Sequence, residues 1–346
     1  MSSLARAIET GDLAELPSRR DEDWRWTDLR GLIRELPAPS SGDRDWSGTG
    51  PFDHLQGSWI ELVNGASASI SVAPGGTETW GVNVVADADA GAHTSRLGIM
   101  IGEGGSLTLL ESYQGEREGY VVETDLAVEL ATDARLERVV IANDGQGAVS
   151  VSIANVTLSA GAVFAQTVVT SGARRQRIET RVVHPGGGAS ARLDGVYLLA
   201  DQRHADITTV VDHTGPGGTT DQLTKGVVRD QARGVFQGRI VVEPGADQTD
   251  ARMGHHALVL SERAEVDAKP ELEIFADDVA CAHGNTVGAL DEDALFYAAQ
   301  RGIPAPEAKA MLTEAFVGEV VDRIEHVGAR EVVRAWVAER LRGWAP

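Results

Sequence analysis

The sequence predicts a mainly β protein, built as a β-solenoid between helical regions at its two ends. Three observations favour this class. Between about residues 57 and 275 apolar residues recur at every second position, as in residues 149–153, which is the period of strands. A weak repeat of about 28 residues runs through the same region. Before and after this region, the apolar spacing changes to that of helices.

The composition indicates a globular protein whose ligands are not polyanions. Apolar residues make up 42% of the chain and charged residues 24%. The formal charge of −21 argues against binding to nucleic acid or to an anionic membrane surface. The N-terminus lacks the apolar core of a secretion signal, and no apolar run is long enough to span a bilayer. A single cysteine cannot form an internal disulfide, so we expect a cytoplasmic protein in a reducing compartment.

Residues 1–50 are expected to form an N-terminal helical region and a linker. Leu4, Ala7 and Ile8 have helical spacing. Thr27 and Asp28 can cap a further helical turn. That turn would carry Leu29, Leu32, Ile33 and Leu36. The run of Pro, Ser and Gly in residues 37–50 is typical of a linker.

Residues 51–288 are expected to form the β core. Glycine-rich turns separate the alternating strands, and a small residue recurs where a turn passes into a strand. The recurring positions are Ser106, Ala134, Ala162, Ala189 and, with longer insertions, Ala232 and Ala264. Stacked rungs of a solenoid give such a regular spacing, whereas a β-sandwich, the alternative, gives uneven spacing.

Residues 289–346 are expected to form a C-terminal helical region. Asp291 can cap a helix that runs to Arg301 and stops at Gly302, and Pro306 suits the first turn of the next helix. An apolar stripe then predicts a helix that ends at Gly328 and a last helix after it. The stripe residues are Leu312, Phe316, Val320 and Ile324, followed by Val333, Trp336, Val337 and Leu341. This stripe could pack against the end of the strand domain or bind a partner.

Motifs for nucleotide binding and for common hydrolases are absent from the sequence. There is no Gly-x4-Gly-Lys-Ser/Thr loop, Gly-x-Ser-x-Gly elbow, His-Glu-x-x-His helix or paired-cysteine zinc spacing. We therefore expect no ATP site in this chain and no catalytic activity of its own. If the function requires nucleotide hydrolysis, a partner must supply it.

The segment DDVACAHG, residues 277–284, contains the only cysteine, two positions before a histidine. In an extended segment Cys281 and His283 would face the same side, about 7 Å apart at their bases. Asp277 and Asp278 disfavour a nucleophilic thiolate, whereas a bound metal would deprotonate its own thiol ligand. A buried, inert thiol is the alternative. Because one cysteine cannot hold an iron–sulfur cluster, a second subunit would have to complete the site.

The adjacent pair His255 and His256 is a weaker metal candidate. Adjacent residues on a strand face opposite sides, so the two imidazoles cannot chelate a metal from one face. The sequence leaves their role open.

Several stretches of the sequence together resemble those of a known protein family. They are RRDEDWRWTDL near the N-terminus, Lys225-Gly226, FQGRI at 236–240, TDA at 249–251, KPELEIFADDVACAHG at 269–284, Thr286-Val-Gly288, Phe296-Tyr297 and Arg301-Gly302. The chain resembles the SufB/SufD family of iron–sulfur cluster assembly proteins. Its length and its single cysteine resemble the SufD branch rather than the SufB branch. One departure is Met253-Gly254-His255, where relatives often have Gln-x-Asn.

The resemblance implies a right-handed parallel β-helix and a complex with a SufB-like subunit and the SufC-like ABC ATPase. Residues 289–346, including 301–316, would dock SufC, and the strands near Cys281 would pair with SufB. His283 matches a histidine that helps to bind the nascent cluster or its iron, and Cys281 matches the neighbouring family cysteine. The iron–sulfur cluster would be transient and shared with SufB. The family also uses FADH2 in the assembled complex, although no flavin contact can be placed here.

Two other readings of the sequence stay open. Solenoid periodicity and acidic charge also suit a β-helix enzyme that acts on polysaccharide, although such an enzyme would need an export signal. A purely structural homodimeric scaffold with Cys281 buried is the second. An exposed strand edge would also allow the isolated chain to form a homodimer.

Overall fold

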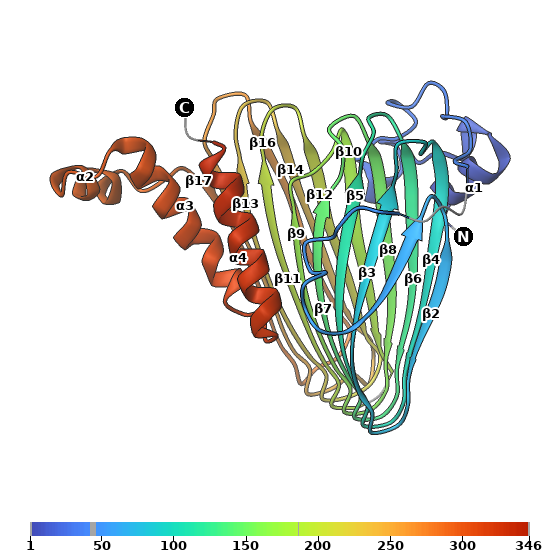
Figure 1. Cartoon of the computed structure of the whole chain (residues 1–346). Helices are drawn as coiled ribbons and strands as arrows, with labels where there is room; N and C mark the ends of the chain where they lie inside the picture. The colour runs from blue at the N-terminus through green and yellow to red at the C-terminus, as the bar shows by residue number, and fades with distance from the viewer. Residues whose placement is uncertain (1, 42–45, 186, 345–346) are drawn as a thin grey trace.

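The computed structural model describes residues 2–41, 46–185 and 187–344. Within them the strands alternate between two sheets, so each turn of the chain adds one strand to each sheet (Figure 1). The nine-stranded sheet contains, in spatial order, β1 (Ser58–Val63), β3 (Thr77–Ala86), β5 (Ser106–Gly115), β7 (Arg135–Asn143), β9 (Val163–Thr170), β11 (Ser190–Leu199), β13 (Thr219–Val228), β15 (Asp250–Val259) and β17 (Ala280–Gly288). The eight-stranded sheet contains β2 (Ser67–Val72), β4 (Ala92–Ile101), β6 (Val121–Leu130), β8 (Val149–Leu158), β10 (Arg175–His184), β12 (His204–His213), β14 (Arg233–Val242) and β16 (Glu265–Ile274).

All of these neighbouring strands pair in parallel. The predicted solenoid is therefore confirmed as a parallel β-helix. Its corners use left-handed backbone, as at Gly104 (φ 62°) and Asp133 (φ 57°). Glycine and short polar residues adopt this conformation most easily. At each of these corners the backbone N–H donates to the corner of the next turn, with acceptors Thr132 and Ala160. This stacking explains the glycine-rich turns of the sequence.

The predicted repeat matches the register of one sheet over three positions. The positions just before β7, β9 and β11 are fully buried and aligned: Ala134, Ala162 and Ala189. Ser106 is offset by one residue, because it pairs with Arg135. Ala232 and Ala264 precede β14 and β16 of the other sheet. The expectation that they continue the same row was wrong, because each turn contributes two strands and small residues precede strands in both sheets.

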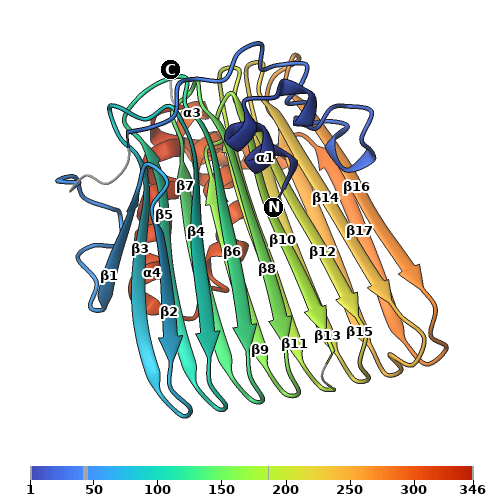
Figure 2. The ribbon, with the colours of Figure 1, turned by 90° about the vertical axis from the view of Figure 1, so that its right-hand side faces the viewer.

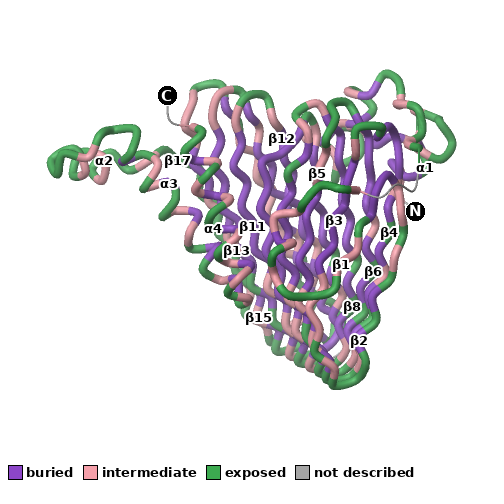
Figure 3. Tube along the Cα trace, in the orientation of Figure 1, coloured by how far each residue is buried: buried purple, intermediate pink, exposed green. Residues whose placement is uncertain are grey.

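The interior is mostly apolar, and its middle turns also bury a charged cluster. Arg138 and Glu111 form two hydrogen bonds of 2.6 and 2.8 Å with side chains only 1% exposed. Arg138 also donates to Gln166 (2.7 Å), which in turn bonds Thr180 of the facing sheet. A buried charge is tolerated only when it is paired and hydrogen-bonded. Figure 3 shows how deeply the strands of these turns are buried.

The N-terminal segment packs on the outer face of the eight-stranded sheet, near the starts of its strands (Figure 2). It contains α1 (Ser3–Thr10) and the short 3-10 helices Leu13–Glu15 and Glu22–Trp24. The first predicted helix is thus confirmed. After Asp28, however, the chain makes a single turn, in which Asp28 accepts from the Gly31 N–H at 2.8 Å. The predicted capped turn is therefore present with Leu29, Leu32 and Ile33. It ends before Leu36, because Pro37 disfavours helical backbone at that residue.

Buried polar contacts fix this segment to the sheet. The Trp24 ring lies over the guanidinium of Arg177, 4.5 Å from its carbon atom. Arg177 donates to the Asp23 carbonyl at 2.6 Å and to Asp206 at 2.9 Å. Thr27 also donates to Asp206, at 2.5 Å. The recognisable motif RRDEDWRWTDL therefore serves to anchor the segment across the sheet.

The first part of the predicted linker pairs with the start of β4. Pro39 forms a bridge with Ala92, and Ser40 accepts from the Gly91 N–H at 2.8 Å. Residues 42–45 of that linker lie outside the described residues.

The C-terminal region contains α2 (Glu292–Gln300), α3 (Ala305–Val321) and α4 (Val327–Arg342). Helices α3 and α4 pack on the outer face of the nine-stranded sheet, whereas α2 projects from the body and buries none of its residues (Figure 1). The apolar stripe thus packs on the sheet face rather than on the end of the strand domain. None of the described helices has the length and apolar content needed to cross a membrane.

The ends of these helices agree with the predictions from the sequence, with one exception. The Asp291 side chain accepts from the N–H groups of Asp293 and Ala294, as expected of a cap. The prediction that Gly328 ends α3 was wrong. Gly328 lies in the first turn of α4, because the His326 ring accepts from the Ala329 N–H at 3.0 Å and starts a new helix there.

Candidate functional site

The Cys-x-His segment forms β17, the edge strand of the nine-stranded sheet. It pairs with β15 on one side, and no described strand pairs with its other edge. The last strand of the facing sheet, β16, is likewise an edge, so the solenoid is open at this end (Figure 2). Apolar side chains are exposed nearby: Ile274 (42%), Phe275 (59%) and Val287 (49%).

The parallel register fixes the direction of the two candidate ligands. Cys281 lies beside Ala251, and His283 lies beside Met253. Ala251 and Met253 are buried in the solenoid interior. Cys281 and His283 therefore share the inward face of the last turn, as predicted for an extended segment. Cys281 is half-buried against the apolar core, whereas His283 is exposed because no further turn of the described chain covers it.

The environment of Cys281 keeps its thiol protonated in the isolated chain. Burial raises the pKa of the Cys281 thiol, a hydrogen bond with the Ala251 backbone offsets part of this rise, and the nearby Asp250 carboxylate adds a smaller rise. A thiol with a raised pKa is a poor nucleophile at neutral pH. A metal cation reverses this preference, because it stabilises the thiolate that binds it.

The two adjacent histidines point to opposite sides of β15, as predicted. His255 is fully buried inside, where its Nε2 lies 2.9 Å from the Tyr197 hydroxyl and its Nδ1 lies 2.7 Å from Asn285 Oδ1. Burial lowers the pKa of His255 to about 4, so its ring is neutral at pH 7. His256 lies on the outer face, with Nδ1 2.7 Å from the Thr286 hydroxyl. A joint chelate by this pair is therefore excluded.

The nearby carboxylates do not complete a metal site. Asp250 pairs with Arg252 at 3.2 Å, and Asp278 uses its backbone carbonyl to accept from Gln248 N–H at 2.6 Å. Within the described residues, no three His, Cys, Asp or Glu side chains are arranged to hold a metal ion. Cys281 and His283 can supply one sulfur and one nitrogen. This donor set suits iron, but only as part of a coordination shell.

Two residues beside the candidate ligands were missed by the sequence interpretation. Asn285 continues the inward row of Cys281 and His283, and the two-residue period could have identified it. Tyr197 contacts His255 from two strands away, and no local signal could have revealed that contact.

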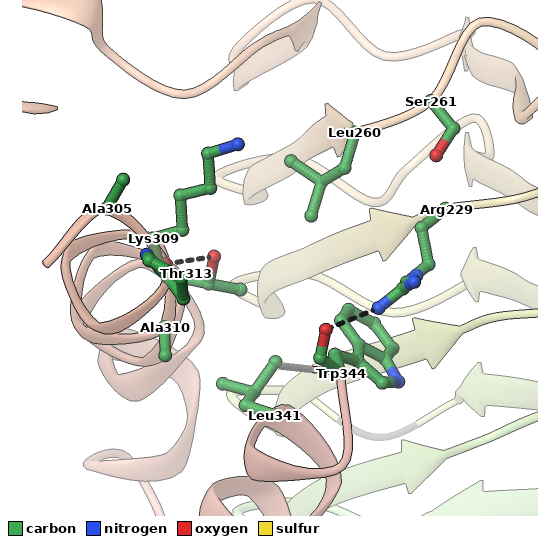
Figure 4. Close-up of a pocket in the computed structure, with 10 residues that line it drawn as sticks. Arg229, Leu260, Ser261, Ala305, Lys309, Ala310, Thr313, Leu341 and Trp344 are labelled. Atoms are coloured by element: carbon green, nitrogen blue, oxygen red, sulfur yellow. Dashed lines mark hydrogen bonds between the residues drawn. The ribbon is translucent and has the colours of Figure 1, made fainter. Parts of the chain in front are cut away.

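A separate pocket of about 350 Å³ lies between α3, α4 and the ends of β13 and β15. Leu260, Leu341 and Trp344 form its apolar wall, and the Arg229 guanidinium donates to the Trp344 carbonyl at 2.7 Å (Figure 4). Lys309 of α3 also lines it. Neither Cys281 nor His283 contributes to this pocket.

Comparison with known proteins identifies the family. Residues 84–316 match the family model described as "SUF system FeS cluster assembly, SufBD core domain". The chain is 29% identical to the iron–sulfur cluster assembly protein SufD of Escherichia coli over 71% of this chain and 58% of that protein. It is 28% identical to an iron–sulfur cluster assembly SufBD family protein of Mycobacterium leprae over 95% of this chain and 92% of that protein.

A third relative is SufD of Bacillus subtilis, with 30% identity over 45% of this chain and 36% of that protein. The match thus spans little more than half of the E. coli protein and about a third of the B. subtilis one, but nearly all of the mycobacterial one. The family model covers the β core from the end of β3 onward, including the candidate site, and extends into α3. The chain belongs to the SufB/SufD family of iron–sulfur cluster assembly proteins and is a SufD-like member of it.

Proposed function

We propose that this chain is a non-catalytic scaffold subunit that pairs with a SufB-like subunit and binds a SufC-like ABC ATPase. The nascent cluster, or its iron, would be held between this chain and the SufB-like subunit. The observation that carries the proposal is the position of Cys281 and His283 on the inward face of an edge strand. Two ligands at an open edge suit a site that two subunits share.

The edge of β17 supports strand pairing with the partner. An edge strand offers a row of backbone N–H and C=O groups that another chain can pair with. Val287 and Phe275, which are about half exposed, would become buried in such an interface. In the absence of the SufB-like subunit, a second copy of this chain could pair at the same edge and form a homodimer.

The chemistry assigned to each ligand follows from its surroundings. The exposed imidazole of His283 can bind iron through a neutral nitrogen. Cys281 would bind as a thiolate after the metal displaces its proton to solvent. The remaining ligands and the sulfur would come from the SufB-like subunit. Electrons from FADH2 would enter the assembled complex elsewhere, and the whole reaction would take place in the cytoplasm.

Residues 289–346 are proposed to dock the ATPase. Helix α2 buries none of its residues, and its Phe296 and Tyr297 are 67% and 61% exposed. Met311 on α3 is 52% exposed, although α3 packs its other face on the sheet. Exposed apolar side chains gathered on α2 and α3 are typical of a protein–protein interface. The ATPase would supply the nucleotide hydrolysis for which this sequence has no motif.

The ligand role is tested by coexpression with the SufB-like and SufC-like partners. The purified complexes are reconstituted anaerobically, and their iron and sulfide are measured for wild type, His283→Ala and the control His256→Ala. We expect an intact complex in all three and loss of cluster in His283→Ala only. Wild-type cluster content in the His283→Ala complex would reject the ligand role and leave the segment as interface structure.

The docking role needs a separate experiment. Met311→Glu places a charge in the proposed interface, whereas Glu314→Ala changes an exposed residue of the same helix. We expect the first variant to lose copurification with the ATPase while retaining the SufB-like subunit, and the second to retain both. Retention of the ATPase by Met311→Glu and by Phe296→Glu would place its docking surface elsewhere.

A further inference from the structure

We propose that Asn285 is a further residue of the site, and that His255 positions it. In this arrangement the Asn285 carboxamide donates hydrogen bonds to the sulfur atoms around the bound iron, beside His283. The inference rests on the proposed function, because it requires that iron or a nascent cluster binds at the β17 edge.

The first support is the place of Asn285 on the strand. Cys281, His283 and Asn285 follow one another at every second position of β17, so all three lie on the inward face. Asn285 pairs with the buried His255, just as His283 pairs with Met253. The Asn285 side chain is exposed at the open end of the solenoid. It is therefore next to His283 in the row and accessible to a molecule bound there.

The second support is the direction of the hydrogen bonds. The Tyr197 hydroxyl is fully buried, and His255 Nε2 is its hydrogen-bond partner among the described residues. A buried O–H that does not donate is costly, so Tyr197 donates to Nε2. The neutral ring then carries its proton on Nδ1 and donates to Asn285 Oδ1. The carboxamide is thereby turned with its N–H2 group away from His255.

This orientation leaves two donors without a protein acceptor. Within the residues that the structure describes, the Asn285 amide nitrogen has no hydrogen-bond partner. The N–H2 group therefore remains available at the same open end as His283. Thiolate and sulfide ligands of iron carry negative charge and accept hydrogen bonds from amide groups, which tunes the cluster potential.

The packing around His255 restricts its ring to this arrangement. The Phe236 ring stacks on it with centroids 4.7 Å apart and planes only 2° apart. Tyr197 reaches His255 because Gly226 has no side chain; a Cβ there would overlap the Tyr197 ring. Phe236 and Gly226 belong to the stretches that resemble the family. They support a buried histidine directly behind the candidate ligands.

The test compares Asn285→Leu, Tyr197→Phe and His255→Ala with the outer-face control His256→Ala. Each chain is assembled with its SufB-like and SufC-like partners and reconstituted anaerobically. The cluster's midpoint potential and its iron–sulfur stretching bands in resonance Raman spectra are measured beside iron content. In the isolated chain, nitrogen-15 spectra of histidine report the His255 tautomer independently of any cluster.

We expect Asn285→Leu to shift the midpoint potential to more negative values and to change the stretching bands. His255→Ala should do the same and retain iron about 10-fold less well, as is typical when a residue that orients a ligand is removed. Tyr197→Phe should alter the His255 tautomer and shift the potential less. His256→Ala should match wild type.

The outcomes separate this inference from the ligand proposal. If His283→Ala loses the cluster while Asn285→Leu keeps the wild-type potential and bands, the Asn285 inference alone is overturned. If His283→Ala keeps the cluster while Asn285→Leu shifts the potential, the His283 role fails and the Asn285 role stands. If neither variant differs from wild type, both fail. Because Asn285 is exposed, its variant remains informative even if His255→Ala does not fold.

Discussion

The middle turns and the last turn of the solenoid place polar side chains on the same inward face, with opposite consequences. One row of paired positions runs from Arg138 through Gln166, Leu193 and Gln222 to Met253 and His283. At the Arg138 end, turns on both sides bury the side chain and supply Glu111 and Gln166 as partners. At the His283 end, the covering turn is missing.

This difference shows that position in the stack, rather than residue type, decides the role of an inward polar group. Inside the stack such a group must be neutralised by the protein, and it contributes to stability only as part of a satisfied network. At the end of the stack the same face is open, and its donors are available to another molecule. His255 and Asn285 lie at the boundary between these two situations.

The largest expected effect on folding stability is at the buried charged cluster of the middle turns. Arg138→Ala leaves Glu111 buried without its cation, which typically costs about 3–5 kcal/mol. Urea unfolding followed by circular dichroism should show a large fall in midpoint. Arg135→Ala, an exposed arginine on the same strand, is the control and should leave the midpoint nearly unchanged. Equal midpoints for the two variants would mean that the buried network is not needed for stability.

A second prediction compares the buried His255 with the exposed His283. His255→Ala removes two hydrogen bonds and an aromatic stack from the interior, so we expect a loss of about 2–3 kcal/mol. His283→Ala, on the neighbouring edge strand β17, should change stability by less than about 0.5 kcal/mol. Unfolding curves of the isolated chains measure both. A similar loss in His283→Ala would indicate that the last turn is a structural element.

Lowering the pH should destabilise the interior of the solenoid. The buried rings of His184 and His213 stack with centroids 4.3 Å apart, and burial lowers their pKa values to about 3 and about 4. Below the unfolded pKa of about 6.5, the unfolded chain binds protons that the folded chain does not, so stability falls as pH falls through this window. The slope is about 1.4 kcal/mol per pH unit for each such histidine.

The variant His184→Phe keeps the stack and removes one titrating group, so the loss of stability between pH 6.5 and pH 4 should shrink. The exposed His54→Phe serves as the matched control. Burial also raises the pKa of Asp194 to about 7. The stability that this group contributes is present at low pH and is lost as pH rises through about 7, which is opposite to the dependence of the histidines. For this reason the slopes of variant and control are compared with wild type rather than read alone. Identical slopes for His184→Phe and wild type would contradict this account.

A small effect is also expected at Cys281. Because the thiol is half-buried at the edge, Cys281→Ser should lower the stability of the isolated chain by less than about 1 kcal/mol. Its raised pKa predicts slow alkylation at pH 7 and a rate that still rises above pH 9. Iodoacetamide labelling followed by mass spectrometry measures the rate. Fast labelling at pH 7 would indicate an activated thiolate, contrary to the environment described above.

The architecture could be predicted from sequence where the signal is local. The two-residue period predicted the strands, and the helix caps at Asp291 and Gly302 were recognisable from residue type. Errors arose where a local pattern had two meanings. Gly328 resembled a helix stop but lies inside α4, because the preceding His326 caps the new helix. Ala232 and Ala264 resembled the first row of the repeat but lie in the second sheet.

By itself the sequence determined the solenoid, its helical ends and the pair Cys281 and His283 on one face, because alternation and spacing along the chain specify these. Only the tertiary structure decided that β17 is an open edge and that Tyr197, His255 and Asn285 form one hydrogen-bonded chain. These residues are separated by 58 and 30 positions in the sequence. They meet because parallel stacking turns distant residues into neighbours, and no local period encodes that register.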